Sequence, residues 1–207
     1  MESNNFKKPD AGCDRYGKQR LDLAVYLRDN ILNKISNVSF IENGTLLGAW
    51  RNGKFIKHDD DFDFAVLINS YDNVNKIFKF IQNNLVDKYQ CRLITNYSTK
   101  IEILDDSFGK YKLLGPQYKN ADFHYVTIDL QFYMKKNNMY ESMYYISVKK
   151  DIIHEKIIIP TSKIMLENEL FNAPNKTEIF LKEIYGSLDI NAKYNSKTGF
   201  YIAPDKM

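Results

Sequence analysis

A short acidic run in the first third of the chain leads directly into an apolar run: Asp59, Asp60, Asp61 and Asp63 precede Ala65 to Ile68. If the run is extended, alternate side chains share a face, so Asp59, Asp61 and Asp63 point the same way. Two carboxylates about 4 Å apart repel each other by about 4 kcal/mol at an effective dielectric constant near 20. A cation must offset this repulsion, and Mg²⁺ or Mn²⁺ suits oxygen ligands. The alternative is a solvated acidic loop, but the apolar run anchors the carboxylates to a buried strand.

A third carboxylate is expected from a neighbouring strand. Asp129 interrupts an otherwise apolar run, and burying a carboxylate there without a partner would be costly. We therefore predict that Asp61, Asp63 and Asp129 hold the metal, with Asp59 as a further ligand candidate. Asp129 could instead be a salt-bridged residue at a strand end, and Glu102 is a weaker alternative for the third acid.

A phosphate site is predicted beside the acids. Gly44 and Thr45 can open a helix, and the free backbone N–H groups at a helix N-terminus bind anions. This arrangement would bring a phosphate next to the predicted metal ligands.

Helices and strands that alternate along the chain must position these residues. Helical spacing of apolar residues predicts packing helices over 20–35 and 71–86, and a last helix over about 176–185. Residues 38–44 resemble a short strand, and 45–53 a single helical segment that Gly53 can end. Runs of β-branched and aromatic residues predict strands over 58–68, 91–95, 100–104, 124–133 and 141–148, and short pieces of sheet over 153–160 and 162–171. Residues 191–207 show no clear period.

Composition and charge limit the class of protein. The 207 residues are 44% hydrophobic, which suffices for one core, and we expect a single α/β (α+β) domain over 1–207, with a core at about 20–187 and a tail at 188–207. The net charge of +3 is too small to indicate nucleic acid. Neither an apolar run of membrane-spanning length nor a secretory leader is visible, so we expect a cytoplasmic protein with no membrane span.

With these residues identified, the sequence resembles the LicD family of the nucleotidyltransferase-fold superfamily, which also contains fukutin and the fukutin-related protein. The resemblance extends from about Leu21 to Gly186. It depends on segments in a fixed order: Gly44 to Ala49, then Arg51, Gly53, Ile56, the acids Asp59 to Asp63, and a proline-containing segment and helix from Ala173 to Gly186.

The resemblance implies a nucleotidyltransferase-like mixed β-sheet flanked by helices, and metal ions held by Asp61, Asp63 and Asp129. It also implies transfer of a phosphocholine or phospho-alditol group from a CDP-linked donor to a hydroxyl of a glycan. In such an in-line displacement two metal ions would clamp the attacking and leaving oxygens, and Asp129 could accept the proton of the hydroxyl.

Several basic residues are candidates for contacts with the donor. Arg51, Lys54 and Lys57 could neutralise the departing nucleotide, although surface solvation explains each lysine equally well. His58 is a candidate neighbour of the acids.

Two other functions remain open. A nucleotidyltransferase would use the same metal site to attach a nucleoside monophosphate from an NTP donor to a small molecule or RNA, with release of pyrophosphate. A non-catalytic nucleotide-binding relative is the second alternative, but a retired site has no reason to keep a repulsive cluster.

Overall fold

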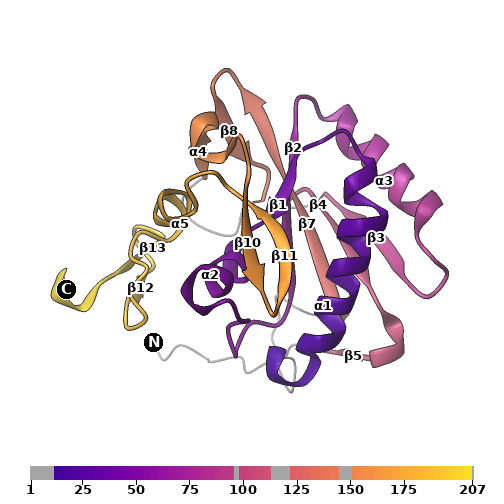
Figure 1. Cartoon of the computed structure of the whole chain (residues 1–207), viewed down its shortest axis with the longest axis horizontal. Coiled ribbons are helices and arrows are strands. Elements are labelled where there is room, and N and C mark those ends of the chain that lie inside the picture. The colour runs from indigo at the N-terminus through magenta and orange to yellow at the C-terminus, as the bar shows by residue number, and fades with distance from the viewer. Residues whose placement is uncertain (1–11, 96–97, 113–121, 145–150, 207) are drawn as a thin grey trace.

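A mixed β-sheet forms the centre of the molecule (Figure 1). The computed structural model describes residues 12–95, 98–112, 122–144 and 151–206. Within them the sheet has seven strands, five of which run in the order β1, β2, β7, β4, β3, while β8 and β9 extend it from β7. The bounds are β1 Ser39–Ile41, β2 Phe62–Ile68, β3 Gln90–Ile94, β4 Lys100–Leu104, β7 Thr127–Lys136, β8 Met139–Ser142 and β9 Ile152–His154. The pair β2 and β7 is parallel, and the other pairs of this sheet are antiparallel.

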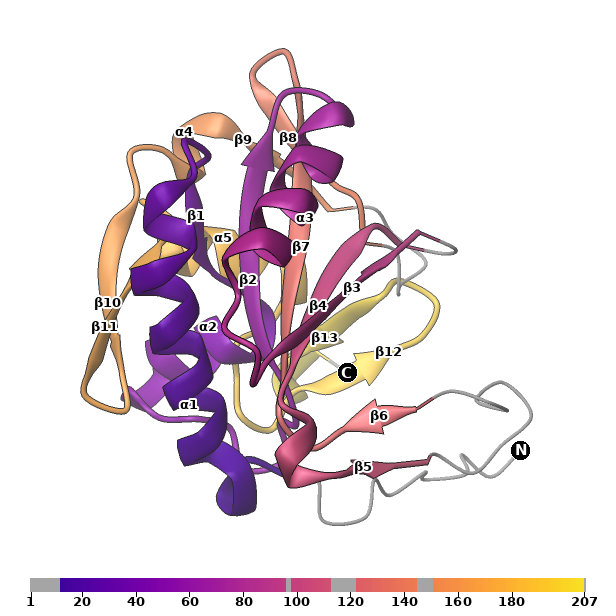
Figure 2. The same cartoon turned by 90° about the vertical axis from the view of Figure 1, so that its right-hand side faces the viewer.

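Helices cover both faces of this sheet (Figure 2). Helices α1 (Cys13–Asn30) and α3 (Asp72–Asn84) lie on one face, and α2 (Asn43–Asn52) and α5 (Thr177–Tyr185) lie on the other. In the described ranges the other helical turns are α4 (Glu155–Ile158), η1 (Leu32–Lys34), η2 (Asp106–Phe108) and η4 (Pro204–Lys206). Among the helices of the described ranges, none combines the length and the apolar character that crossing a bilayer requires.

Three two-stranded sheets complete the structure. They pair β5 (Lys110–Tyr111) with β6 (Phe123–His124), β10 (Ser162–Leu166) with β11 (Glu169–Ala173), and β12 (Lys193–Asn195) with β13 (Phe200–Ile202). The pair β12–β13 lies on the same side of the central sheet as α2 and α5.

The strand register separates an apolar face from a polar one. Phe62 pairs with Ile128 in the neighbouring strand, and both side chains are buried. Because side chains alternate along a strand, Asp63 and its partner Asp129 point to the other side, toward α2 and α5. The sequence period thus places two carboxylates side by side.

Glycines end the two helices on the polar side. Gly53, which follows α2, has φ 71° and donates its N–H to Ala49 O at 3.0 Å, and Gly186, which follows α5, has φ 77°. This left-handed conformation favours glycine because it has no Cβ.

The fold class, the mixed sheet and most predicted elements are confirmed, but several details differ. The first helix begins at Cys13, well before residue 20. The acids before Phe62 precede β2 and are not part of a strand, so strict alternation from residue 59 was wrong. Part of 153–160 is the helical turn α4, and the tail contains β12 and β13. Of the strand predicted over 141–148, residues 141–142 belong to β8, and 145–150 lie outside the described residues.

Candidate active site

Three carboxylates converge at the start of β2. Asp61, Asp63 and Asp129 each place one oxygen within 4.8 Å of the others. Asp63 and Asp129 are only 5% and 3% exposed, while Asp61 is half-buried. Water therefore screens little of the repulsion among them.

Polar neighbours fix the orientation of the two buried acids. Gln131 donates Nε2–H to Asp63 Oδ1 at 2.8 Å, and the backbone N–H of Asp63 donates to Thr45 Oγ1 at 3.1 Å. Lys100 donates Nζ–H to Asp129 Oδ2 at 2.6 Å. Asp129 Oδ1 is buried and has no hydrogen-bond partner among the described residues.

An ion-pair chain continues from Asp129 across the sheet. Lys100 Nζ also lies 2.9 Å from Glu102 Oε1, and Arg92 bonds the other oxygen of Glu102. Although burial alone would raise the pKa of Glu102, the charges of Lys100 and Arg92 hold it below its usual value. Glu102, the alternative third acid, is thus already neutralised by these two cations, which leaves Asp129 as the better ligand.

The buried acids resist ionisation when no cation is bound. Burial, followed by repulsion from Asp61 and Asp129, raises the pKa of Asp63 well above its ordinary value. Burial likewise raises the pKa of Asp129 to about 7, although Lys100 opposes this shift. A divalent cation would fit here, since it would reduce the repulsion and provide a partner for Asp129 Oδ1.

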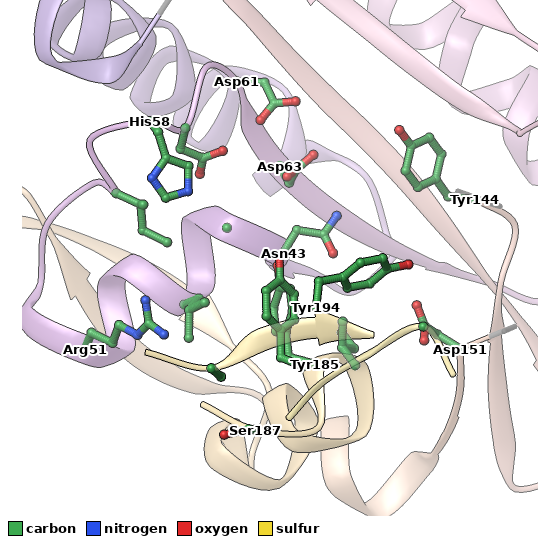
Figure 3. A pocket seen from close by; sticks show the side chains of 18 of the residues that line it. Asn43, Arg51, His58, Asp61, Asp63, Tyr144, Asp151, Tyr185, Ser187 and Tyr194 are labelled. Atoms are coloured by element: carbon green, nitrogen blue, oxygen red, sulfur yellow. The ribbon is translucent and has the colours of Figure 1, made fainter. Parts of the chain in front are cut away.

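The acid cluster opens into a cavity of about 770 Å³ (Figure 3). This volume is in the range of small-molecule sites. Asp61 and Asp63 lie on its wall, and Arg51 and His58 lie at one end, with Tyr144 and Asp151 at the other. The cavity places oxygen ligands, a fixed cation and aromatic side chains around a single space.

Asp59 lines the same cavity but is not one of the three converging acids. It belongs to a second group with Asp60 and Asp61, which precedes β2. A Cβ on Gly44 would lie 2.4 Å from Asp59 Oδ2, so the carboxyl of Asp59 lies against the start of α2. Asp59 precedes β2, so the strand alternation that grouped it with Asp63 is not observed. Gly44 and Asp59 both line the cavity, and their roles as a phosphate contact and a metal ligand stay predictions.

Other predicted donor contacts divide between two places. Arg51 and His58 line the cavity, and Arg51 also donates Nη2–H to Leu188 O at 3.1 Å. Lys54 and Lys57 line a different hollow beside α1, so their position does not support a contact with the donor. Thr45 is fully buried and its hydroxyl oxygen accepts from Asp63, so it positions the acid-bearing strand and does not reach a phosphate.

Sequence reasoning missed several residues of the site. Gln131 had a detectable signal, since it stands two residues from Asp129 on the same strand face, and Lys100 stands likewise beside Glu102. The cavity wall formed by Tyr194 and Tyr201 had none, because the tail has no recognisable period and its hairpin is short.

The arrangement can hold a divalent cation and accommodate a phosphorylated ligand beside it. A comparison with curated proteins found no match. A family model described as LicD/FKTN/FKRP, nucleotidyltransferase domain, matches residues 37–176, which include β1, α2, the acid cluster and most of the sheet. Membership in this family indicates a transferase that acts on phosphorus-containing groups. Because the match covers more than half of the chain, the protein belongs to the LicD/FKTN/FKRP family.

Proposed function

We propose that this protein transfers a phosphocholine or phospho-alditol group from a CDP-linked donor to a hydroxyl of a glycan. The hydroxyl oxygen forms a bond to the phosphorus atom of the transferred group. The bond from that phosphorus to the oxygen of the CMP portion breaks, so CMP leaves with the bonding electron pair. The hydroxyl proton passes to a base or to water.

The observation that carries this proposal is the convergence of Asp61, Asp63 and Asp129, of which Asp61 and Asp63 line the cavity. These three carboxylates would hold Mg²⁺ or Mn²⁺. When bound, such an ion neutralises phosphate oxygens and the charge that develops on the leaving oxygen. Phosphoryl transfer depends mainly on positioning and on electrostatic stabilisation, which suits a site made of fixed charges.

The remaining side chains hold the reacting groups in place. Gln131 orients Asp63, and Lys100 orients Asp129 through Oδ2 while leaving Oδ1 available. Arg51 offers further N–H groups to a phosphate at its end of the cavity. The cavity walls exclude part of the water that would otherwise compete with the glycan hydroxyl.

The proposal is tested by the products released from different donors. The protein is incubated with CDP-choline, a CDP-alditol or CTP, each with Mn²⁺ and a panel of methyl glycosides, and CMP and pyrophosphate are quantified. We expect CMP release that depends on the glycoside and a loss of at least about 100-fold in D61N and D63N, because the charge stabilisation is removed. Equal rates in the wild type and both variants would contradict the proposal.

A nucleotidyltransferase is the second candidate function. The same three acids would serve it, and the matched domain is described as a nucleotidyltransferase domain. Pyrophosphate release from CTP without CMP release from either CDP-linked donor would favour this candidate.

A further inference from the structure

The C-terminal segment forms one wall of the cavity. Ser187, Ile190, Tyr194 and Tyr201 line it, and they come from the connection after α5 and from β12–β13. This wall, named here the C-terminal wall, follows the region that the family model matches, which ends at residue 176. The family match therefore does not describe it.

The C-terminal wall exposes apolar side chains inside a concave surface. Ile190, Tyr194 and Tyr201 are 80%, 52% and 39% exposed, and the rings of Tyr194 and Tyr201 lie 5.4 Å apart. Exposed apolar side chains that gather in a cavity are typical of a ligand-binding surface.

Specific contacts fasten this wall to the core. The N–H of Ser187 donates to Tyr201 O at 3.0 Å, and the Tyr185 and Tyr201 rings lie 6.0 Å apart. Arg51, on α2, binds Leu188 O at 3.1 Å. The exposed rings are thus held in position across the cavity from the acids, as Figure 3 shows for Tyr194 and Asp61.

A cationic side chain, Arg51, lies beside the C-terminal wall. The Arg51 guanidinium binds the backbone of the wall, so it repels a cationic group there and attracts a phosphate. Asp189 also lines this part of the cavity, and its Oδ1 accepts the N–H of Asn191 at 2.7 Å. The opposite end of the cavity, with Tyr144 and Asp151, is acidic. It suits the group that the donor transfers.

We propose that the C-terminal wall is the subsite for the nucleobase of the donor, with Tyr194 as its stacking surface. This inference rests on the proposed function, because it assumes a nucleotide donor. A base that stacks on Tyr194 would keep its attached phosphates near Arg51 and the acid cluster. Aromatic rings bind bases through their π-faces, and removal of one such ring weakens binding by about 10-fold or more.

Calorimetric titration with two probes tests the subsite. CMP and ribose 5-phosphate are titrated in Mg²⁺ into the wild type, Y194A, Y194F and Y71A. Tyr71 is the matched control, since it is 46% exposed and lies outside the cavity wall. We expect Y194A to weaken CMP binding by about 10-fold or more with little effect on ribose 5-phosphate, and Y194F and Y71A to bind like the wild type.

The other possible outcomes distinguish a failure of the nucleobase subsite from a failure of the proposed function. Unchanged CMP affinity in Y194A, equal weakening of both probes, or no CMP binding to the wild type would overturn the nucleobase subsite. In a further titration with phosphocholine, a loss of affinity in Y194A with normal CMP affinity would also overturn it, because the wall would then bind the transferred group. Tyrosine-dependent CMP binding by a protein that lacks transferase activity would support the subsite and contradict the proposed function.

Discussion

Asp63 combines two unfavourable conditions, since it is 5% exposed and lies within a few ångströms of Asp61 and Asp129. Hydrogen bonds from Gln131 and to Thr45 hold it in this position. A protein that needed only stability would gain from replacing such a carboxylate. The energetic cost is therefore consistent with a functional requirement for negative charge at this place.

Glu42 provides a residue-scale prediction about pH. Its carboxyl is fully buried, and burial, with smaller effects of Asp151 and Asp129, raises its pKa from the ordinary 4.5 to about 8, against the opposing effect of Tyr133. The unfolded chain loses this proton at lower pH than the native protein, so the stability present below about pH 4.5 is lost as the pH rises toward about 8. E42Q cannot titrate, so its free energy of unfolding should fall less over this window, by on the order of 3 kcal/mol.

Urea unfolding at pH 5, 6, 7 and 8 measures this difference. E183Q, which changes an exposed residue of α5, is the matched control and should follow the wild type. Parallel pH profiles for E42Q and the wild type would disprove the account of Glu42.

At the scale of elements, α2 is packed closely against the loop that carries the acids. A Cβ on Gly48 would lie 2.4 Å from the backbone oxygen of Lys54, whereas the atoms nearest to a Cβ on Gly44 belong to the side chain of Asp59. A side chain can rotate away, but the backbone turn after α2 cannot move without disturbing its packing. A side chain is therefore tolerated less well at Gly48 than at Gly44, although both glycines lie in α2.

We predict that G48A lowers the free energy of unfolding by about 1–3 kcal/mol through overpacking. G44A should change it by less than about 0.5 kcal/mol, because the higher helix propensity of alanine offsets the displacement of Asp59. Chemical denaturation of both variants checks this pair, and equal destabilisation by the two substitutions would be inconsistent with the packing described.

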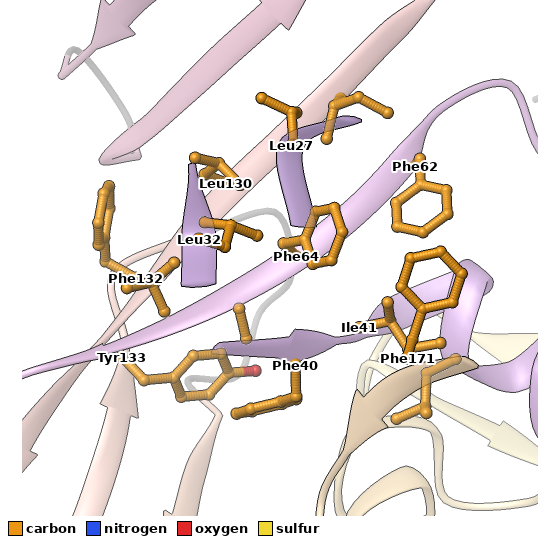
Figure 4. Close-up of a cluster of buried hydrophobic side chains, with 14 of the residues drawn as sticks. Leu27, Leu32, Phe40, Ile41, Phe62, Phe64, Leu130, Phe132, Tyr133 and Phe171 are labelled. Carbon is orange, nitrogen blue, oxygen red and sulfur yellow. The ribbon is translucent and has the colours of Figure 1, made fainter. Parts of the chain in front are cut away.

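Helix α5 joins the core to the C-terminal wall. Phe180 is fully buried, with its ring 5.5 Å from that of Phe40 and 6.3 Å from that of Tyr133. Figure 4 shows Phe40 and Tyr133 in the buried cluster. Its neighbour Ile179 is 45% exposed.

Truncation of these two neighbours should have very different effects. F180A should cost about 3–5 kcal/mol, the usual loss for a buried phenylalanine, and I179A less than about 1 kcal/mol. The midpoint of thermal unfolding provides the measurement. A small effect of F180A would mean that α5 contributes little to the core.

At the scale of the whole molecule, the sequence predicted those parts of the fold that a local pattern specifies. The amphipathic helices, the apolar strand after Asp63 and the strand around Asp129 have clear periods, and the parallel pairing of β2 with β7 then brings the two acids together. The loop before β2 could not be predicted, because its path depends on contacts with α2 and with Tyr111, which donates its hydroxyl to Asp60 at 2.9 Å.

The cavity was less predictable than the acid cluster. Its walls come from α2, β2, β7, β8, α5 and the tail, and the association of segments so distant in sequence depends on tertiary packing. Lys54 and Lys57 were assigned by sequence proximity alone, and the turn after α2 directs them to another hollow.

The most direct test of the account is thermal unfolding of the wild type and of the double variant D61N/D63N, each in EDTA and in millimolar Mn²⁺. In EDTA the variant should be more stable by about 1–2 kcal/mol, since repulsion is relieved while asparagine Oδ1 still accepts from Gln131. Mn²⁺ at about 100 times its dissociation constant should stabilise the wild type by about 2.7 kcal/mol, which raises its Tm by about 5–10 °C, and should not affect the variant. A wild-type Tm that is the same in EDTA and Mn²⁺, with a variant no more stable than the wild type in EDTA, would contradict a metal site at these acids.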